Sequence, residues 1–89
     1  MKISYDPVKN AKNISERGLS FERAADFDFS SAFIVEDKRR DYGEVRYRAL
    51  GRVEGRLHAL VFTETSDGIR VISFRKANKR EVTQYENFA

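Results

Sequence analysis

The segment from Arg56 to Lys76 restricts the possible folds of this chain more than any other segment, because it has the pattern of a β-hairpin. Leu57–Thr63 is apolar and β-rich on both faces, which predicts a central strand buried on both sides. Ser66–Gly68 predicts a tight turn in which Gly68 is free to take a positive φ. Ile69–Phe74 predicts the returning strand. We therefore expect the other elements to be arranged around this hairpin.

Arginine residues frame the hairpin. Arg56 precedes its first strand, Arg70 lies within its second strand and Arg75 follows that strand. A buried sheet with fixed cations along one edge or end can bind a phosphate-rich ligand, since the guanidinium fork matches phosphate oxygens. The alternative is that these side chains only solvate the edge of a sheet.

The charge of the chain is unevenly distributed. Its 89 residues indicate a single domain, 1–89, with a net charge of +3. Residues 1–45 hold 8 basic and 9 acidic residues, a net charge of −1, whereas residues 46–89 hold 9 and 5, a net charge of +4. The half that contains the hairpin is therefore the basic half. This favours an anionic partner, for which nucleic acid is the commonest candidate.

Several classes of chemistry are excluded or not indicated. The chain has no cysteine, so it forms no disulfide and has no thiolate nucleophile. It has one histidine and no visible cluster of metal ligands, so we expect neither a metal nor a cofactor. It has no apolar run of membrane-spanning length and no signal-peptide core, so we expect no membrane association and a cytoplasmic location.

The N-terminal part predicts a strand followed by two helices. Lys2–Tyr5 alternates as a short edge strand does. Asp6 is a helix cap and Pro7 a first helical residue, and the helix is expected to run to about Arg17. Its narrow apolar stripe is Val8, Ala11 and Ile14. A second helix is expected from the cap Ser20 to near Asp28.

The central part predicts two more strands separated by a charged segment. The strands are Ala32–Val35 and Arg46–Val53, the second with Arg46, Arg48 and Arg52 on the same face as Leu50. Arginines on one face repel each other unless anions or acids lie opposite. The segment 36–44 is either a solvated loop or a mobile flap that holds Tyr42, Glu44 and the Arg39–Arg40 pair near a ligand.

The chain closes with a predicted helix. Asn78 and Glu81 have the spacing of a capping box, with Val82, Tyr85 and Phe88 expected to face inward. The predicted order is β-α-α-β-β-β-β-α. This indicates an α+β fold in which helices pack on a twisted antiparallel sheet.

Short motifs with a defined spacing follow one another along nearly the whole chain. They are Tyr5–Lys9 with Asn13, Gly18–Ala24, Glu36–Asp37, Tyr42–Arg46, Leu50–Gly51, Gly55–Arg56, Val61–Thr63 and Ile69–Ala77, continuing through Glu81 and Tyr85. Together these motifs resemble the BrnT toxins of type II toxin–antitoxin systems. The resemblance implies a RelE-like fold and a ribonuclease that arrests growth. It also implies a cognate, BrnA-like antitoxin with a ribbon-helix-helix domain, and contact with operator DNA only through that antitoxin.

Two positions depart from the family pattern. Members often carry a histidine where this chain has Arg17, and an arginine after the threonine of the central strand where this chain has Glu64. If either position is catalytic elsewhere, this protein is a weaker nuclease or uses its other cations differently.

Metal-independent RNA cleavage needs a base, an acid and cations that stabilise the charged phosphorane. With one histidine, His58, the chain cannot use a two-histidine mechanism, and His58 itself is expected to be a hydrogen-bonded sheet residue. The candidate base is Glu44, if a neighbouring arginine keeps it ionised. The candidate phosphate clamp is Arg46, Arg70 and Arg75, although strict alternation puts Arg70 and Arg75 on opposite faces.

A second group of cations is expected to bind RNA outside the reacting phosphate: Arg48, Arg56, Lys76, Lys79 and Arg80. Tyr85 is expected to pack in the core rather than to reach a ligand. The alternative to a nuclease is a module that binds nucleic acid or an antitoxin without chemistry, because no motif here by itself demands catalysis.

Overall fold

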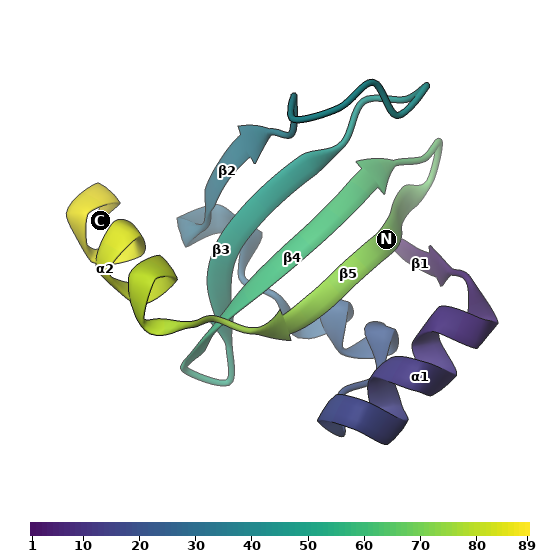
Figure 1. Ribbon diagram of the computed structural model, residues 1–89, viewed down its shortest axis with the longest axis horizontal. Coiled ribbons are helices and arrows are strands. Elements are labelled where there is room, and N and C mark those ends of the chain that lie inside the picture. Colours follow the sequence, from purple (N-terminus) through teal and green to yellow (C-terminus); the bar gives the residue numbers. More distant parts are fainter.

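The predicted hairpin is the centre of a five-stranded sheet with the strand order β1-β5-β4-β3-β2 (Figure 1). The computed structural model describes residues 1–89. The hairpin strands are β4 and β5, and β3 joins them through a turn in which Glu54 and Gly55 both have a positive φ. The elements are β1 (Lys2–Tyr5), α1 (Pro7–Arg17), the 3₁₀ helices η1 (Phe21–Asp26) and η2 (Phe29–Ser31), β2 (Phe33–Glu36), β3 (Tyr47–Val53), β4 (Arg56–Glu64), β5 (Gly68–Lys76) and α2 (Lys79–Phe88).

The sheet is mixed, so the predicted antiparallel sheet is correct for four strands and wrong for β1. Strands β2 to β5 are antiparallel, but β1 pairs in parallel with β5, from Lys2 opposite Gly68 to Tyr5 opposite Val71. The parallel direction leads the chain toward the unpaired second half of β5. There Asn13 of α1 donates from Nδ2 to the carbonyl of Phe74 at 2.9 Å. A main-chain acceptor on this strand is thereby paired with a helix side chain.

Gly68 does not take the positive φ that the turn pattern predicts. Positive φ among the glycines is confined to Gly18, Gly43 and Gly55. Gly68 instead begins β5, where an added Cβ would overlap the carbonyl oxygen of Lys2. A glycine is therefore required at this position because the backbone of β1 passes directly against it.

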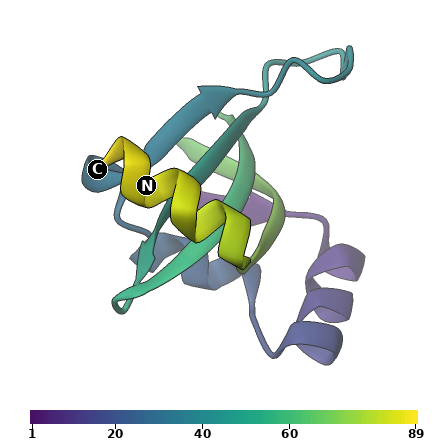
Figure 2. The same cartoon turned by 60° about the vertical axis from the view of Figure 1, so that its left-hand side comes forward.

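The two faces of the sheet are covered differently. The face toward η1 holds the main core, in which Leu60 and Phe74 are the largest fully buried side chains. The other face carries α2, whose Tyr85 packs on Leu50 and Leu57. Figure 2 shows α2 lying across the strands and α1 away from it at the opposite corner of the molecule. We call the part of this second face that α2 leaves uncovered the open face.

The helices differ from their sequence patterns in three places. The predicted second helix is the short 3₁₀ helix η1, which still buries Phe21 in the core. In α1 no residue is buried, and the apolar stripe residues Val8 and Ile14 are exposed because asparagines rather than apolar side chains attach this helix to the protein. In α2 Val82 is exposed, and Phe88 stacks on Phe33 but is half exposed, so only Tyr85 faces fully inward.

No helix of the protein has both the length and the apolar character needed to cross a bilayer.

Candidate functional site

One extra residue in β5 brings Arg70 and Arg75 to the same face of the sheet. The register with β4 runs Phe62 opposite Val71 and then Val61 opposite Ser73, so Ile72 has no partner and forms a β-bulge. A bulge resets the alternation of side chains beyond it. Strict alternation, which puts Arg70 and Arg75 on opposite faces, is therefore wrong for this strand.

Arg70 and Arg75 mark the two ends of the open face. Arg70 lies opposite Thr63 and Arg75 opposite Ala59 on β4. Thr63 lies four positions beyond Ala59 along an extended strand, so the two positions are about 13 Å apart. This span suits a short stretch of extended polymer rather than one small anion.

At the Arg70 end, one carboxylate holds two guanidinium groups. Glu44 accepts bonds from Arg70 NH2 at 2.7 and 2.8 Å and from Arg46 Nε at 2.9 Å. The bond from Arg46, followed by the charge of Arg70, lowers the pKa of Glu44, so this carboxylate is ionised at neutral pH. Arg46 also lies 4.3 Å from the ring centre of Tyr42, a cation–π contact that fixes its direction.

The segment before Glu44 is an irregular and mostly exposed loop with one buried side chain, Asp37. Asp37 is only 4% exposed, and its carboxylate accepts bonds from Arg39 Nε at 2.8 Å, Arg39 NH2 at 2.7 Å and Tyr42 Oη at 3.1 Å. The Arg39 guanidinium holds the pKa of Asp37 well below its usual range. Asp37 therefore fixes the shape of the segment and the direction of Arg39.

At the other end of the open face, Arg75 forms a two-point ion pair with α2. Its NH1 and NH2 atoms donate to the two carboxylate oxygens of Glu81 at 2.7 and 2.9 Å. The same carboxylate accepts from the backbone N–H of Asn78 at 2.9 Å and completes the predicted capping box. Arg75 lowers the pKa of Glu81, and Glu81 raises that of Arg75.

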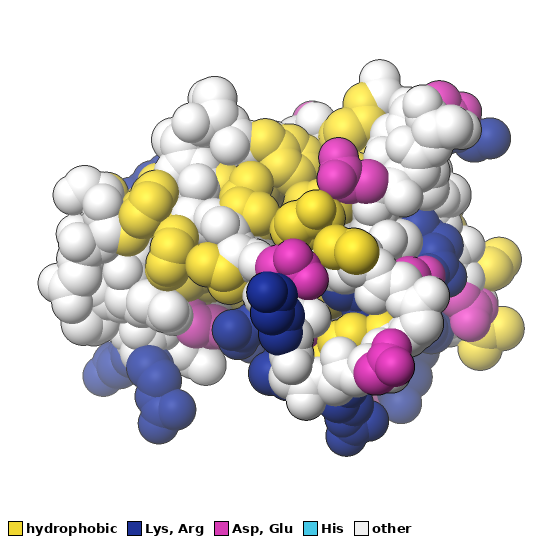
Figure 3. All heavy atoms as spheres, turned by 90° about the horizontal axis from the view of Figure 1, so that it is seen from above, with side chains coloured by type: hydrophobic (Ala, Val, Ile, Leu, Met, Phe, Trp, Pro, Cys, Tyr) yellow, Lys and Arg dark blue, Asp and Glu magenta, His cyan; other side chains and the backbone are white.

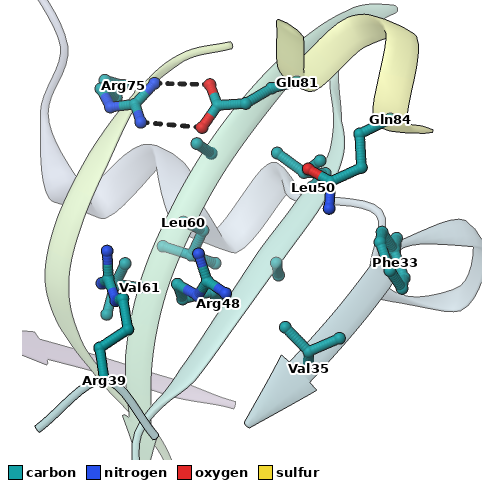
Figure 4. Close-up of a pocket in the computed structure, with 12 residues that line it drawn as sticks. Phe33, Val35, Arg39, Arg48, Leu50, Leu60, Val61, Arg75, Glu81 and Gln84 are labelled. Atoms are coloured by element: carbon teal, nitrogen blue, oxygen red, sulfur yellow. Dashed lines mark hydrogen bonds and ion pairs between the residues drawn. The ribbon is translucent and has the colours of Figure 1, made fainter. Parts of the chain in front are cut away.

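A cleft of about 140 Å³ lies beside this ion pair, between α2 and the exposed part of β3. Figure 4 shows Arg39 and Arg48 near Val61 on its floor, apart from the Arg75–Glu81 pair. Arg48 takes part in none of the protein's ion pairs. Arg48 can therefore bind an anion at this cleft without first losing a carboxylate.

Seen from above, the molecule presents a charged and an apolar side. Figure 3 shows Lys and Arg side chains along the lower border of that view and a hydrophobic patch in its centre and upper part. Met1, Phe29 and Ile34 line a shallow hollow on the core side of the sheet.

The structure does not bring all the predicted RNA-binding cations together. Arg48 joins Arg75 at the cleft, but Arg56 and Lys76 line a separate cavity on the core side of the sheet, beside His58. Lys79 and Arg80 are exposed in the first turn of α2. The predicted set is therefore divided between the open face, the start of α2 and a second site.

His58 and Tyr85 have the structural roles expected from the sequence. His58 is 4% exposed and its Nδ1 lies 2.7 Å from the carbonyl oxygen of Arg56. Tyr85 is buried, and its hydroxyl donates to the carbonyl of Ser31 at 2.9 Å.

Sequence reasoning missed two carboxylates that organise the site. Asp37 lies in the charged segment and in one of the segments that resemble the family, and its position directly after an edge strand is a signal for a residue that fixes a loop. Glu81 has the spacing of a cap and also lies in a matching segment, but nothing in the local pattern indicates that it pairs with Arg75.

No group of three or more histidine, aspartate or glutamate side chains is arranged to hold a metal ion.

Comparison with known proteins defines the class. A sequence model of the family described as "Ribonuclease toxin, BrnT, of type II toxin-antitoxin system" matches residues 5–81. The chain therefore belongs to the BrnT family of ribonuclease toxins. No curated protein and no solved structure matches it.

Proposed function

We propose that the protein is an endoribonuclease toxin that cleaves RNA without a metal ion, and that the RNA binds across the open face. One observation carries the proposal: an ionised Glu44 lies between Arg46 and Arg70, on the same face as Arg75. A base and phosphate-binding cations are thus side by side. The order of the elements supports a RelE-like fold as part of this proposal.

The proposed chemistry follows from these groups. Glu44 removes the proton of a 2′-hydroxyl, and the freed oxygen attacks the adjacent phosphorus while the bond to the 5′-oxygen breaks. Arg46 and Arg70 stabilise the charge that develops on the phosphorane oxygens. The leaving 5′-oxygen takes a proton from water, to which this end of the face is open. Arg48 and Arg75 hold the neighbouring part of the strand.

The partners proposed with this function are RNA and an antitoxin. In the cell, cleavage would inhibit translation and growth in the cytoplasm. A cognate, BrnA-like ribbon-helix-helix antitoxin would neutralise the toxin by placing acidic side chains against the arginines of the open face, since buried like charges need compensation. Operator DNA would be contacted only through that antitoxin.

The experiment is RNA cleavage by the purified protein with and without EDTA, and with and without ribosomes. We expect fragments in the presence of EDTA from the wild type and from Lys9→Ala, which changes an exposed charge of α1 on another side of the molecule. We expect none from Arg70→Ala or Arg75→Gln, each with an unchanged circular dichroism spectrum. Absence of cleavage by the wild type under every condition would contradict the proposal.

Growth separates the nuclease from a protein that only binds. Overexpression of the wild type should arrest growth, and overexpression of Arg70→Ala should not. If both proteins leave growth unchanged yet bind RNA in a strongly salt-dependent way, the non-catalytic alternative is correct.

A further inference from the structure

A second cationic cavity lies on the core side of the sheet, away from the open face. Its volume is about 490 Å³, and it lies where the end of α1 approaches the turn between β3 and β4. Four cations, one acid and the histidine line it: Arg17, Arg23, Arg56, Lys76, Glu54 and His58. We call it the basic cavity.

Most of these cations lack an acidic partner. Arg17, Arg56 and Lys76 take part in no ion pair of the protein, and only Arg23 is paired, with Asp26 at 3.1 Å and Glu54 at 3.4 Å. On the open face the opposite holds, because there most arginines have a carboxylate. A hollow lined by uncompensated charges of one sign concentrates counter-ions from solution.

His58 adds an imidazole ring of fixed orientation to the wall of the basic cavity. Its Nδ1 must donate to the carbonyl oxygen of Arg56, because that oxygen can only accept. In the neutral ring Nε2 therefore carries the lone pair. No fully buried side-chain nitrogen of the protein lacks a partner, and Nε2 makes no hydrogen bond to the protein, so Nε2 is not sealed from solvent, and His58 lines the cavity. When an anion binds there, a protonated His58 can donate to it through Nε2.

The lining favours a phosphate group over a base. Only Leu19 and Val53 are apolar, and no phenylalanine or tyrosine lines the cavity, so its lining is mainly cationic and offers a nucleobase no large aromatic ring. We propose that the basic cavity is a second phosphate-binding site, held by Arg56, Lys76 and Arg17 with His58 at its wall. It goes beyond the proposed cleavage site and does not depend on cleavage there.

The single histidine of the chain makes the test direct. The proton NMR signal of the His58 ring is followed at low ionic strength during titration with inorganic phosphate or with a short 2′-O-methylated RNA, which this chemistry cannot cleave. We expect a saturable shift of the signal. Burial, followed by the nearby cations, lowers the pKa of His58 in the free protein, and a bound anion should raise it again.

Substitutions in the basic cavity test whether the phosphate or RNA binds there. Arg56→Gln and Lys76→Gln keep part of each side-chain stem, and each should weaken binding at His58 about tenfold or more, the loss of one charge-assisted hydrogen bond. Arg70→Ala on the open face should leave the shift unchanged. A shift with RNA alone assigns the site to part of a strand, and a shift with phosphate alone assigns it to a free phosphate or mononucleotide. No shift with either probe, or an undiminished shift in both Gln variants, would overturn the proposal.

Discussion

At the scale of the residue, carboxylates decide which arginines of the open face are available. Glu44 occupies Arg46 and Arg70, Glu81 occupies Arg75, and Arg48 has no such partner. An RNA phosphate must therefore exchange with Glu44 or Glu81 at the two ends, whereas it meets Arg48 directly. This exchange keeps like charges apart in the free protein and lowers the net gain from each contact.

Replacing Glu44 with Gln should change binding and cleavage in opposite directions. Without the negative charge, Arg46 and Arg70 are free to bind phosphate, so the affinity for uncleavable RNA should rise. The cleavage rate should fall by about 10²–10⁴-fold, as expected for loss of a general base. Fluorescence anisotropy and cleavage kinetics measure the two effects, with Glu86→Gln on exposed α2 as the control. A variant that cleaves at the wild-type rate would exclude Glu44 as the base.

Stability should fall in acid partly because of the same carboxylates. Arginine contacts lower the pKa of Glu44 and Glu81 in the folded protein. Their stabilisation is therefore complete above the unfolded value of about 4.3 and is lost as the pH falls through their lowered folded values. Urea unfolding at pH 7, 5 and 3 should show a smaller decrease between pH 5 and 3 for the Glu44→Gln, Glu81→Gln double variant than for the wild type. Equal decreases would mean that these pairs do not contribute.

At the scale of the element, β5 and α2 are joined by Glu81, which serves both. Its carboxylate caps the first turn of α2 and holds Arg75 of β5. The bulge at Ile72 is what presents Arg75 to that helix, since it sets the face on which the last residues of β5 lie. The docking of α2 and the geometry of the cleft thus depend on one strand irregularity.

Two substitutions of Glu81 should separate the cap from the ion pair. Glu81→Gln keeps an acceptor for the Asn78 N–H but removes the charge, whereas Glu81→Ala removes both. We expect Glu81→Ala to be the less stable, by about 1 kcal/mol, the usual contribution of a cap. Thermal or urea unfolding measures the difference, and identical stability of the two variants would contradict the dual role.

At the scale of the whole molecule, the net charge is only +3, but the basic side chains form two separate surfaces. The open face and the basic cavity lie on opposite faces of the sheet, so that the sheet separates them. RNA affinity should therefore depend steeply on salt, because counter-ions are released at each phosphate contact.

The slope of the salt dependence of RNA affinity should change when a single phosphate contact is removed. Arg48→Ala should reduce the slope of log K against log salt concentration by about one, the effect of a single lost phosphate contact, and should weaken binding uniformly across sequences. Anisotropy titrations between low and physiological salt measure it, with Lys9→Ala as a charge-matched control. An unchanged slope would mean that RNA does not reach the cleft.

Local patterns predicted most of the elements and some of the site. The caps at Asp6 and Asn78, the hairpin and the short edge strand are where their side chains and alternation indicate. Glu44 could be selected because a carboxylate among arginines is held ionised. The parallel pairing of β1, the exposed stripe of α1 and the partner of Arg75 could not be predicted, because each depends on segments distant in sequence.

The sequence by itself determined the order of elements, the uneven charge and the family, since these depend on residue type, spacing and local hydrogen bonding. Only the tertiary structure decided which arginines share a face. A bulge arises from the register between two strands, so the unpaired Ile72 is visible only once β4 lies beside β5. The same pairing put Arg56 and Lys76 on the core side with His58, and thereby made two basic surfaces from one basic half of the chain.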